Sequence, residues 1–592
     1  MVVLLRYAMG VSRGATSVVL TIVTLAGLTG TGLTYLVGQV VGAAGGLARG
    51  DSVGHFAFLL AAMLLLFILN GALPVMWMTA VVTLEMRLDR TVSVELAESL
   101  LRPYRIEHLD DPAVQDTYAH SREEAPVAVR LGPTFAAQVL QGVIGSVTSA
   151  VLIGILFTWW VPIPLALSSA LATWYFSRVI DTESELLRGN TEEQRRATYL
   201  FDIGMTGGTK EVRIFGLSNW LTDGYLTARR VAMARVWRKR WSGLIRDAAV
   251  LLPHVALFAG MMAYAIGEAY RGRMSLASVV AVVPAMIAMS MGFEPWLLGQ
   301  ARKAAASLRS LQRLSGLIEE RYPDSGTASV DLSQAPQDAI RFENVEFSYP
   351  ESTRPVLRGL DLEIRANEAL ALVGVNGAGK STLVKLLAGG YRPTSGRITV
   401  DGVDLATLNS ESLGIWQRRL ATIGQNFIEL PLTVEENIVL SGNHSPVGAA
   451  RAAGVEDLIE ELPQAWSTVL DKTFPGGVDL SGGQWQRVAL ARALFAAESG
   501  AGLLVLDEPA AALDVRSESA LVESYLSLTA GVTSLIISHR FSVVRDAHRI
   551  CVLGDGAILE SGTHEELLAR DGHYARMFRL QASRYFAGDD HA

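Results

Sequence analysis

The stretch Gly374-Val-Asn-Gly-Ala-Gly379-Lys380-Ser381-Thr382 has the spacing of a phosphate-binding loop, in which two glycines separated by four residues precede lysine and serine. It directly follows the apolar run Ala369 to Val373 and precedes the helical run Leu383 to Leu387. A strand, this loop and a helix in that order form the context that the motif requires. The sequence therefore predicts a nucleotide-binding loop made by Gly374, Asn376, Gly377, Ala378, Gly379, Lys380, Ser381 and Thr382.

The residue types of this loop suit the phosphates of a nucleotide. Glycines let successive backbone N–H groups close around the phosphates, and the N-terminus of the following helix favours negative charge. The Lys380 ammonium reaches the terminal phosphates, and the Ser381 hydroxyl is a ligand for Mg²⁺. The alternative is an incidental glycine-rich turn. The full pattern in its expected context favours a site for ATP and Mg²⁺ instead.

A second element of such a site is the apolar run Leu503 to Leu506, which ends in Asp507 and Glu508. Asp507 is suited to hold Mg²⁺, through water, and Glu508 to orient or deprotonate the attacking water. Alone, an apolar strand that ends in two acids is most often an exposed strand end. Together with the phosphate-binding loop, it predicts a hydrolytic site in which Glu508 is catalytic.

A third motif, Leu480-Ser-Gly-Gly-Gln484, opens the helical run from Trp485 to Leu494. Its backbone N–H groups, its serine hydroxyl and the helix dipole are able to bind a second side of a phosphate. At this motif the sequence resembles the ATP-binding cassette (ABC) transporters, whose signature it matches without a change. The residues expected to bind ATP through this motif are Ser481, Gly482, Gly483 and Gln484.

The resemblance covers essentially the whole chain, because six membrane spans followed by one nucleotide-binding domain is the layout of exporter-type half-transporters. In that family the signature of one subunit closes over ATP that the other subunit holds, which implies a dimer with two ATP molecules at its interface. The run from Leu480 to Arg487 and the segment from Lys210 to Phe215 resemble bacterial exporters of lantibiotic-type peptides more than multidrug pumps.

Four further residues take their roles from the resemblance alone. Tyr349 matches the aromatic residue that stacks on adenine, and Gln425 the glutamine that senses Mg²⁺ and the attacking water. His539 matches the histidine that contacts the γ-phosphate, and Asp514 a loop that communicates between the two sites. Without the resemblance, Tyr349 reads as a core tyrosine and His539 as a histidine at a strand end.

Mild departures from the family pattern concern the contacts between subunits rather than the chemistry. Ala510 and Ala511 stand where threonine and serine are common, and Pro475 stands near the signature where the residue is often acidic. The presence of Glu508 implies that two copies of this chain form two competent sites, so we expect a homodimer. Some relatives use an unlike partner, which leaves a heterodimer as the alternative.

Composition supports a membrane protein. Of 592 residues, 50% are hydrophobic and 19% charged, which is too apolar for an ordinary soluble enzyme. The net charge of −8 offers no electrostatic footprint for nucleic acid, and a single cysteine excludes a disulfide or a cysteine-ligated zinc cluster within one chain.

Six apolar runs in the first half are close to the length of about 20 residues that a membrane-spanning helix needs. Lysine and arginine are concentrated in the loops after the second, fourth and sixth runs. Basic loops stay on the cytoplasmic side, so we expect both termini and the nucleotide-binding domain to lie in the cytoplasm. We expect the membrane to be the inner membrane of a bacterium. We expect a helical membrane domain at residues 1–320, a linker at 321–339 and an α/β P-loop nucleotide-binding domain at 340–592. The runs are Ser17 to Val41, His55 to Val82, Phe135 to Trp159, Val161 to Phe176, Ala248 to Ala269 and Leu276 to Leu298.

The two long basic loops are expected to be helical extensions of the spans. Asp111 and Pro112 have the chemistry of an N-cap and a first helical position, which predicts a short helix through about Tyr118. By resemblance, the segments from His108 to Tyr118 and from Thr198 to Phe215 are coupling helices that dock on the nucleotide-binding domains, the second on the partner chain.

The sequence is less informative about the compound that is transported. Glu294 in the sixth run is a candidate cargo contact, because a charge within the membrane is costly, whereas His254 is expected to pack between helices. A weakly polar pathway favours a lipid, a hydrophobic drug or a modified peptide. We expect ATP-driven export of a hydrophobic or amphipathic compound by alternating access; the alternatives are an importer of a siderophore-like compound on the same fold and an ATP-gated regulator that does not pump.

Overall fold

The computed structural model describes residues 1–47, 52–188, 192–291, 294–323, 326–350, 352, 354–424, 427–440, 442, 444–508, 531–538 and 541–586. The chain forms two compact units. Unit 1 contains residues 1–98 and 116–314, and unit 2 contains residues 99–115 and 315–592. The short segment 99–115, which lies between two helices of unit 1 in the sequence, therefore folds with unit 2.

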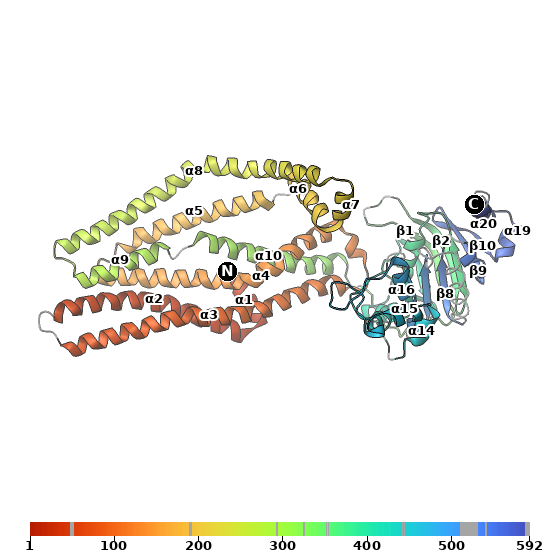
Figure 1. Cartoon of the computed structure of the whole chain (residues 1–592), viewed down its shortest axis with the longest axis horizontal. Helices are drawn as coiled ribbons and strands as arrows, with labels where there is room; N and C mark the ends of the chain where they lie inside the picture. Colours follow the sequence, from red (N-terminus) through yellow and green to blue (C-terminus); the bar gives the residue numbers. More distant parts are fainter. Residues whose placement is uncertain are drawn as a thin grey trace. The chain divides into compact units, whose positions relative to one another are not determined.

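Unit 1 is built of helices that run alongside one another (Figure 1). Long apolar runs without helix-breaking clusters form helices because each backbone group is satisfied within its own segment. Among the described residues, five helical segments are long and apolar enough to cross a membrane. They contain the first, second and fifth expected spans, most of the third and the described part of the sixth. The helices are α1 (Val2–Val11), α2 (Arg13–Leu47), α3 (Val53–Leu101), α4 (Pro112–Leu156), α5 (Pro162–Arg188), α6 (Glu192–Asp202), α7 (Thr209–Ile214), α8 (Ser218–Tyr270), α9 (Leu276–Met291) and α10 (Pro295–Arg321).

The fourth expected span forms α5, which is not one of these five. Its first part is apolar, but the last part of this 27-residue helix has a charged sequence. The sixth expected run contains α9 and the start of α10, and residues 292–293 of this run lie outside the described residues. The chain thus folds into long, largely apolar helices followed by an α/β domain, as the sequence predicts.

Polar contacts between the helices of unit 1 are specific. The two ring nitrogens of His254 on α8 lie 3.1 Å from the hydroxyl oxygens of Ser168 on α5 and Ser290 on α9. His254 is thus a packing residue, as expected. Met286 and Met289 of α9 are buried in the same part of the bundle, so these thioethers fill its core.

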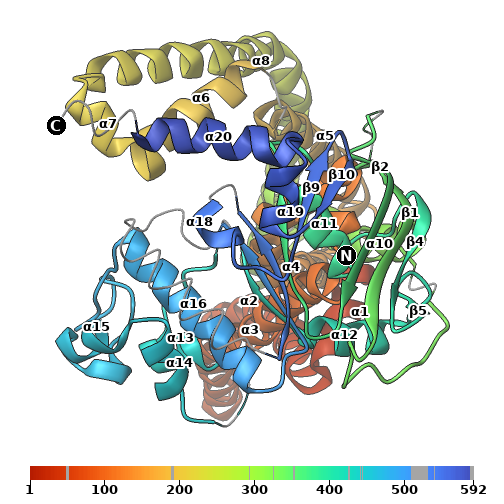
Figure 2. The same ribbon diagram turned by 90° about the vertical axis from the view of Figure 1, so that its right-hand side faces the viewer.

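Unit 2 contains two sheets among its described residues (Figure 2). The larger has the order β10-β9-β3-β8-β7-β6 and is parallel except for the β9–β10 pair, as the apolar strand runs predict. The smaller is an antiparallel sheet of order β2-β1-β4-β5. The strands are β1 (Ala339–Phe347), β2 (Leu357–Arg365), β3 (Ala369–Val373), β4 (Ser395–Val400), β5 (Val403–Asp404), β6 (Leu420–Ile423), β7 (Leu503–Asp507), β8 (Thr533–Ile537), β9 (Arg549–Gly554) and β10 (Ala557–Gly562).

Helices cover the sheets of unit 2. The longest described helix of this unit apart from its connection to unit 1, α16, packs against β6, β7, α13 and α14. Its buried Phe495 and the buried Trp416 of α12 belong to two apolar clusters, each of which includes strands of the larger sheet. The helices are α11 (Lys380–Leu387), α12 (Ser410–Arg418), α13 (Val434–Ile438), α14 (Val447–Ala452), α15 (Glu456–Glu461), α16 (Gly482–Glu498), α18 (Phe541–Val544), α19 (His564–Ala569) and α20 (His573–Phe586).

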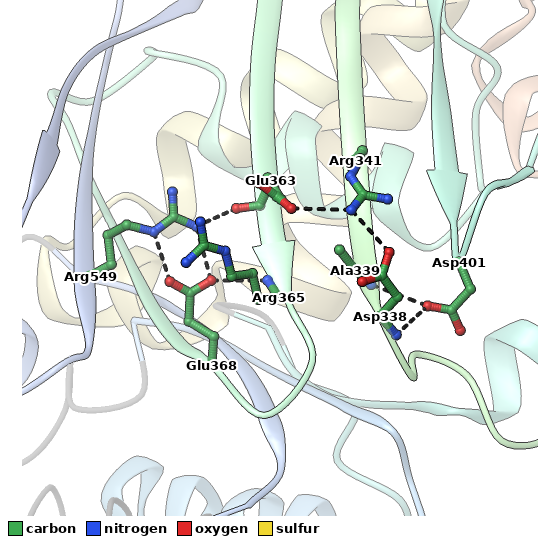
Figure 3. A network of polar contacts seen from close by, with 8 residues as sticks. All are labelled: Asp338, Ala339, Arg341, Glu363, Arg365, Glu368, Asp401 and Arg549. Atoms are coloured by element: carbon green, nitrogen blue, oxygen red, sulfur yellow. Dashed lines mark hydrogen bonds and ion pairs between the residues drawn. The ribbon is translucent and has the colours of Figure 1, made fainter.

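A polar network joins the two sheets (Figure 3). The guanidinium of Arg549 on β9 donates to both carboxylate oxygens of Glu368, at 2.7 and 2.9 Å, and to the Glu363 carbonyl on β2. The Glu363 carboxylate in turn accepts from Arg341 on β1 at 3.3 Å. Burial alone would raise the pKa of Glu368, but the bonds from Arg549 and from the Arg365 N–H outweigh it and hold this pKa below its ordinary value.

We call residues 99–115, which lie at the end of α3 and the start of α4, the first tip. The Ile106 N–H donates to the Gly390 carbonyl at 2.7 Å. The Arg105 guanidinium donates to the carbonyls of Gly389 and Leu405 at 3.2 and 2.9 Å. Two of these acceptors, the carbonyls of Gly389 and Gly390, lie just after the C-terminal end of α11.

Two carboxylates of the first tip, those of Glu107 and Asp110, also accept hydrogen bonds from residues after α11. The Tyr391 hydroxyl donates to the Asp110 carboxylate, and the Arg392 N–H donates to the Glu107 carboxylate. Glu107 and Asp110 are the first and last residues of a single 3₁₀ turn. Through these contacts the first tip packs against residues 389–405 of unit 2.

The short helix expected from Asp111 to Tyr118 is wrong in its length. The Asp111 carboxylate does cap a helix, since it accepts from the Ala113 N–H at 2.8 Å. That helix is α4, however, whose 45 residues, Pro112–Leu156, continue through Pro126 and Pro133 into the apolar third span. The other Asp111 oxygen accepts from Arg321 at 2.8 Å and from the Tyr322 hydroxyl at 3.1 Å. Asp111 thereby ties the first tip to the end of α10.

Candidate nucleotide-binding site

The phosphate-binding loop connects β3, the third strand of the larger sheet in its spatial order, to α11. All five residues of β3 are buried, so the strand fixes the position at which the loop begins. Within the loop, the Lys380 ammonium folds back and donates to the carbonyls of Gly374 and Val375 at 2.8 and 3.1 Å. Burial lowers the pKa of Lys380, and the carboxylates of Asp507 and Glu508 partly offset this. The cation thus lies where a nucleotide's terminal phosphates would replace the two carbonyls as its partners.

Two glycines are required by the loop's backbone. A Cβ atom at Gly374 would lie 2.3 Å from the Leu553 carbonyl oxygen on β9, which is closer than any real contact. Gly379 has φ of +105° and precedes the first residue of α11. A residue with a side chain is strained in that conformation, and a Cβ there would also lie 2.9 Å from Leu357. The motif glycines therefore serve a backbone shape that exposes N–H groups.

The second predicted element meets this loop. The Ser381 hydroxyl lies 3.2 Å from the Asp507 carboxylate at the end of β7. Burial, with the neighbouring Glu508 carboxylate, raises the pKa of Asp507, and the bond from Ser381 and the Lys380 charge oppose this rise. A hydroxyl and a carboxylate oxygen at this separation are a donor set that suits Mg²⁺, a hard cation that binds oxygen.

Glu508 follows β7 with a left-handed backbone, at φ of +54°. Its N–H donates to the Ile537 carbonyl of β8 at 2.8 Å, which holds the residue at the carboxyl end of two adjacent strands. A non-glycine residue in this region costs about 1 kcal/mol or more, and such strain gathers at functional sites.

These residues line one cavity of about 620 Å³, and Asp507 and Glu508 lie on the same cavity as the phosphate-binding loop. The structure thus brings together the two motifs that are 126 residues apart in the sequence. The cavity is lined by Val356, Gly374, Val375, Asn376, Gly377, Gly379, Lys380, Ser381, Thr382, Asp507, Glu508 and Met577.

Tyr349 is not a lining residue of this cavity. Its hydroxyl lies 3.0 Å from the Thr382 hydroxyl, and its ring packs edge-on against Phe347 and Tyr391. The Lys385 ammonium lies 5.2 Å from the centre of the same ring. Tyr349 therefore has the packing of a core tyrosine on one side, and its expected contact with adenine stays a prediction.

The signature motif starts α16. Ser481 is the N-cap, its hydroxyl accepts from the Gln484 N–H at 3.3 Å, and the Gln484 side chain accepts from the Ser481 N–H at 2.8 Å. This reciprocal capping box satisfies two N–H groups that a helix start leaves without partners. Gly482 is exposed, so the turn that the sequence predicts is formed and accessible.

Three other expected site residues, Gln425, His539 and Asp514, lie outside the described residues, as do Ala510 and Ala511. Conversely, Val356 and Met577 line the cavity although no motif pointed to them. Met577 belongs to α20, about 200 residues after the phosphate-binding loop, and an isolated methionine carries no sequence signal for a binding site.

The comparisons with known proteins agree with this geometry. A family model described as ABC transporter matches residues 357–511. The ATP-dependent lipid A-core flippase of Dechloromonas aromatica is 32% identical over 406 residues, which are 68% of this chain and 67% of that protein. The chain belongs to the ABC transporter family. This ABC transporter is a multi-pass membrane protein with a fused ATP-binding domain.

Other matches of the ABC transporter extend the comparison. A flippase of the same name from Nitrosococcus oceani is 35% identical over 386 residues, which are 63% of this chain and 62% of that protein, so the chain spans less than two thirds of its length. A solved structure of a bacterial Atm1-family ABC exporter with ATP bound matches with a TM-score of 0.72, over 96% of this chain and 98% of that one. At 24% identity, this match shows the fold.

Proposed function

We propose that the chain is one subunit of a dimeric, Mg²⁺-dependent ATPase that exports a hydrophobic or amphipathic compound by alternating access. The observation that carries the proposal is the contact between Ser381 and Asp507, beside Glu508, on the cavity of the phosphate-binding loop. The described part of the same chain carries five helical segments that are long and apolar enough to cross a membrane. A hydrolytic nucleotide site fused to such helices is suited to convert hydrolysis into movement across a bilayer.

In this proposal each side chain has one task. Lys380 exchanges its carbonyl partners for the terminal phosphates, and Ser381 and Asp507 hold Mg²⁺, which neutralises charge on the phosphates when bound. Glu508 accepts a proton from, or orients, the attacking water. Gln425 and His539 are proposed to contact the metal and the γ-phosphate.

The proposed assembly is a homodimer in a bacterial inner membrane, with both termini and the nucleotide-binding domain in the cytoplasm. The membrane domain would comprise residues 1–320, the linker 321–339 and the nucleotide-binding domain 340–592. The exposed start of α16 supports a dimer, because Ser481 and Gly482 would then close over ATP held by the other subunit, with Asp514 signalling between the two sites. Tyr349 would stack on adenine after a rearrangement of its ring.

The test is ATP turnover of the full chain in lipid nanodiscs, with wild type compared with Glu508→Gln. We expect turnover to fall about 100-fold or more, because a positioned acid or base contributes at least that factor. ATP binding should persist, because glutamine keeps the shape of the side chain. The exposed Glu565→Gln on α19 is the matched control and should hydrolyse ATP like wild type. Equal turnover in wild type and Glu508→Gln would refute the proposal and favour a nucleotide-gated regulator.

A further inference from the structure

Unit 1 contains a second cavity, of about 510 Å³, whose lining comes from α2, α4, α9, α10 and the residue before α10. Its walls combine small residues with polar ones. Thr31, Gln138, Gln141 and Ser149 supply hydroxyl and amide groups, and Glu294 supplies a carboxylate. This cavity therefore combines several hydrogen-bonding groups with one carboxylate.

The cavity lies at a defined depth. α9 has 16 residues, which extend about 24 Å at about 1.5 Å per residue, and Glu294 comes just after its C-terminal end. Gln138 is a similar distance from the end of α4 at Leu156, and Thr31 from the end of α2 at Leu47. Since the hydrocarbon layer is about 30 Å thick, these groups lie near the leaflet on the nucleotide-domain side in the proposed orientation. A molecule with its head at that level would keep its tail in the same leaflet.

The charge of Glu294 indicates which kind of head group the cavity would bind. Of the described residues that line the cavity, Glu294 is the only one that carries a charge, and the structure gives no ion pair between its carboxylate and a described basic residue. A carboxylate within the membrane is costly unless a cation or water compensates it, so such a residue marks a pathway for cargo. A positively charged group bound beside Glu294 would supply that compensation.

An aromatic side chain adds to this preference. Trp296 lines the cavity two residues after Glu294 and is 51% exposed. Phe135 packs edge-on against it, with ring centres 5.5 Å apart, and so fixes the orientation of the indole. The face of an indole attracts ammonium groups, and a carboxylate next to it strengthens the attraction.

We infer that this cavity binds the positively charged head of an amphipathic cargo, with Glu294 and Trp296 as its recognition residues. The inference rests on the proposed transport function and gives its cargo a chemical class, a lipophilic ammonium compound. The small residues provide the room: a Cβ atom at Gly30 or Gly145 would meet nothing within 4 Å. A larger side chain at either position would occupy the space that the head group needs.

The experiment measures binding without hydrolysis. The full chain in nanodiscs, without ATP, is dialysed against decyltrimethylammonium, decyl sulfate or decyl maltoside, which share one tail and differ in head charge. We expect the cation to bind about tenfold more tightly than the other two, and Glu294→Gln to remove this preference while Glu294→Asp keeps part of it. Gly145→Leu should weaken binding of the cation by filling the cavity. The matched control is Gly260→Leu on α8, where a Cβ also meets nothing within 4 Å and which lies outside the cavity lining, and it should bind like wild type.

The outcomes separate this inference from the proposed function. ATP turnover, measured on the same samples, tests the function and reports whether each variant is folded. If wild type hydrolyses ATP but Glu294→Gln binds the cation as tightly as wild type does, the inference is overturned and the function stands. If binding depends on Glu294 but wild type shows no turnover, the inference stands and the function fails. Preferred binding of decyl sulfate would also overturn the inference.

Discussion

Two connections, one between α3 and α4 and one between α5 and α8, differ in how their tips are covered. The first tip, residues 99–115, belongs to unit 2 and bonds to later residues of that unit through both main-chain and side-chain groups, and its Asp111 is 5% exposed. The second tip, residues 192–217, comprises α6, a π-helical turn at Ile203–Gly207, and α7. Its Ile214 and Phe215 are 78% and 71% exposed. One loop has partners within its own chain, whereas the other presents apolar surface.

The difference indicates which loop depends on a second subunit. An exposed pair of large apolar side chains at a helix end is costly in water and is typical of a contact surface. We therefore propose that the second tip docks on the nucleotide-binding domain of the partner chain, as the family resemblance implies. The first tip would transmit movement within one subunit, and the second between subunits.

The largest effect is expected from charges on the second tip. Replacing Ile214 and Phe215 together by aspartate should weaken docking by about 4 kcal/mol or more, because the burial of two large apolar side chains is lost and two charges would be buried. Hydrogen exchange of the amides of α7 in the full chain in nanodiscs should then be much faster than in wild type.

The control for that variant is Tyr270→Asp at the end of α8, where the side chain is 94% exposed. It introduces the same chemistry away from both tips and should leave the exchange of α7 unchanged. Fast exchange of α7 already in wild type would contradict docking and remove the distinction between the tips.

A smaller effect is expected for Asp111→Ala in the first tip. The substitution removes the cap of α4 and leaves Arg321 and Tyr322 without this acceptor, which should destabilise the contact by about 2 kcal/mol. The measurement is the midpoint of thermal unfolding together with hydrogen exchange of residues 99–115. Asp331→Ala is a matched control, because Asp331 is exposed and accepts from the Ser333 N–H at 2.9 Å.

The pH dependence of this variant gives an independent check. Burial alone would raise the pKa of Asp111, but the bonds from Arg321, the Ala113 N–H and Tyr322 outweigh it and hold the pKa below its ordinary value. A carboxyl with a lowered folded-state pKa stabilises the protein above its unfolded pKa of about 3.9, and this stability is lost as the pH falls through the folded-state value. The difference between wild type and Asp111→Ala should therefore be constant near neutral pH and shrink below about pH 4. A difference that grows on acidification would contradict the assigned bonds.

The smallest effect is expected for Tyr391→Phe, which removes one hydroxyl bond to Asp110 and keeps the ring. Burial, with the bond to Asp110, raises the pKa of Tyr391, so the hydroxyl is protonated at neutral pH and acts as a donor. We expect a loss of about 1 kcal/mol and slightly faster exchange of residues 99–115. Tyr574→Phe removes a comparable buried hydroxyl, which lies 2.7 Å from His564, and should leave that exchange unaffected. Equal exchange in wild type and Tyr391→Phe would show that Asp110 does not help to hold the first tip.

Local patterns predicted those features that depend on neighbours in the sequence. The strand before Gly374, the cap at Asp111 and the turn at Ser481 all follow from residue chemistry within a few positions. The contact of Ser381 with Asp507 was predictable because two motifs of one known site must meet. The partners of the first tip were not, because tyrosine and arginine at positions 391 and 392 have no local pattern that points to a loop about 280 residues earlier. The same limit applies to the packing of Tyr349, which depends on rings from other segments.

Because unit 2 combines residues 99–115 with residues 315–592, its two parts are synthesised at different times. Arg105 bonds to Gly389, 284 residues later in the chain. At a synthesis rate of about 5–20 residues per second, the ribosome needs roughly 15–60 s to deliver that partner. The remaining spans of unit 1 are made in this interval, so they enter the bilayer before the first tip has a surface to fold against. The nucleotide-binding domain then completes its fold against the first tip, whose flanking helices are already in the membrane.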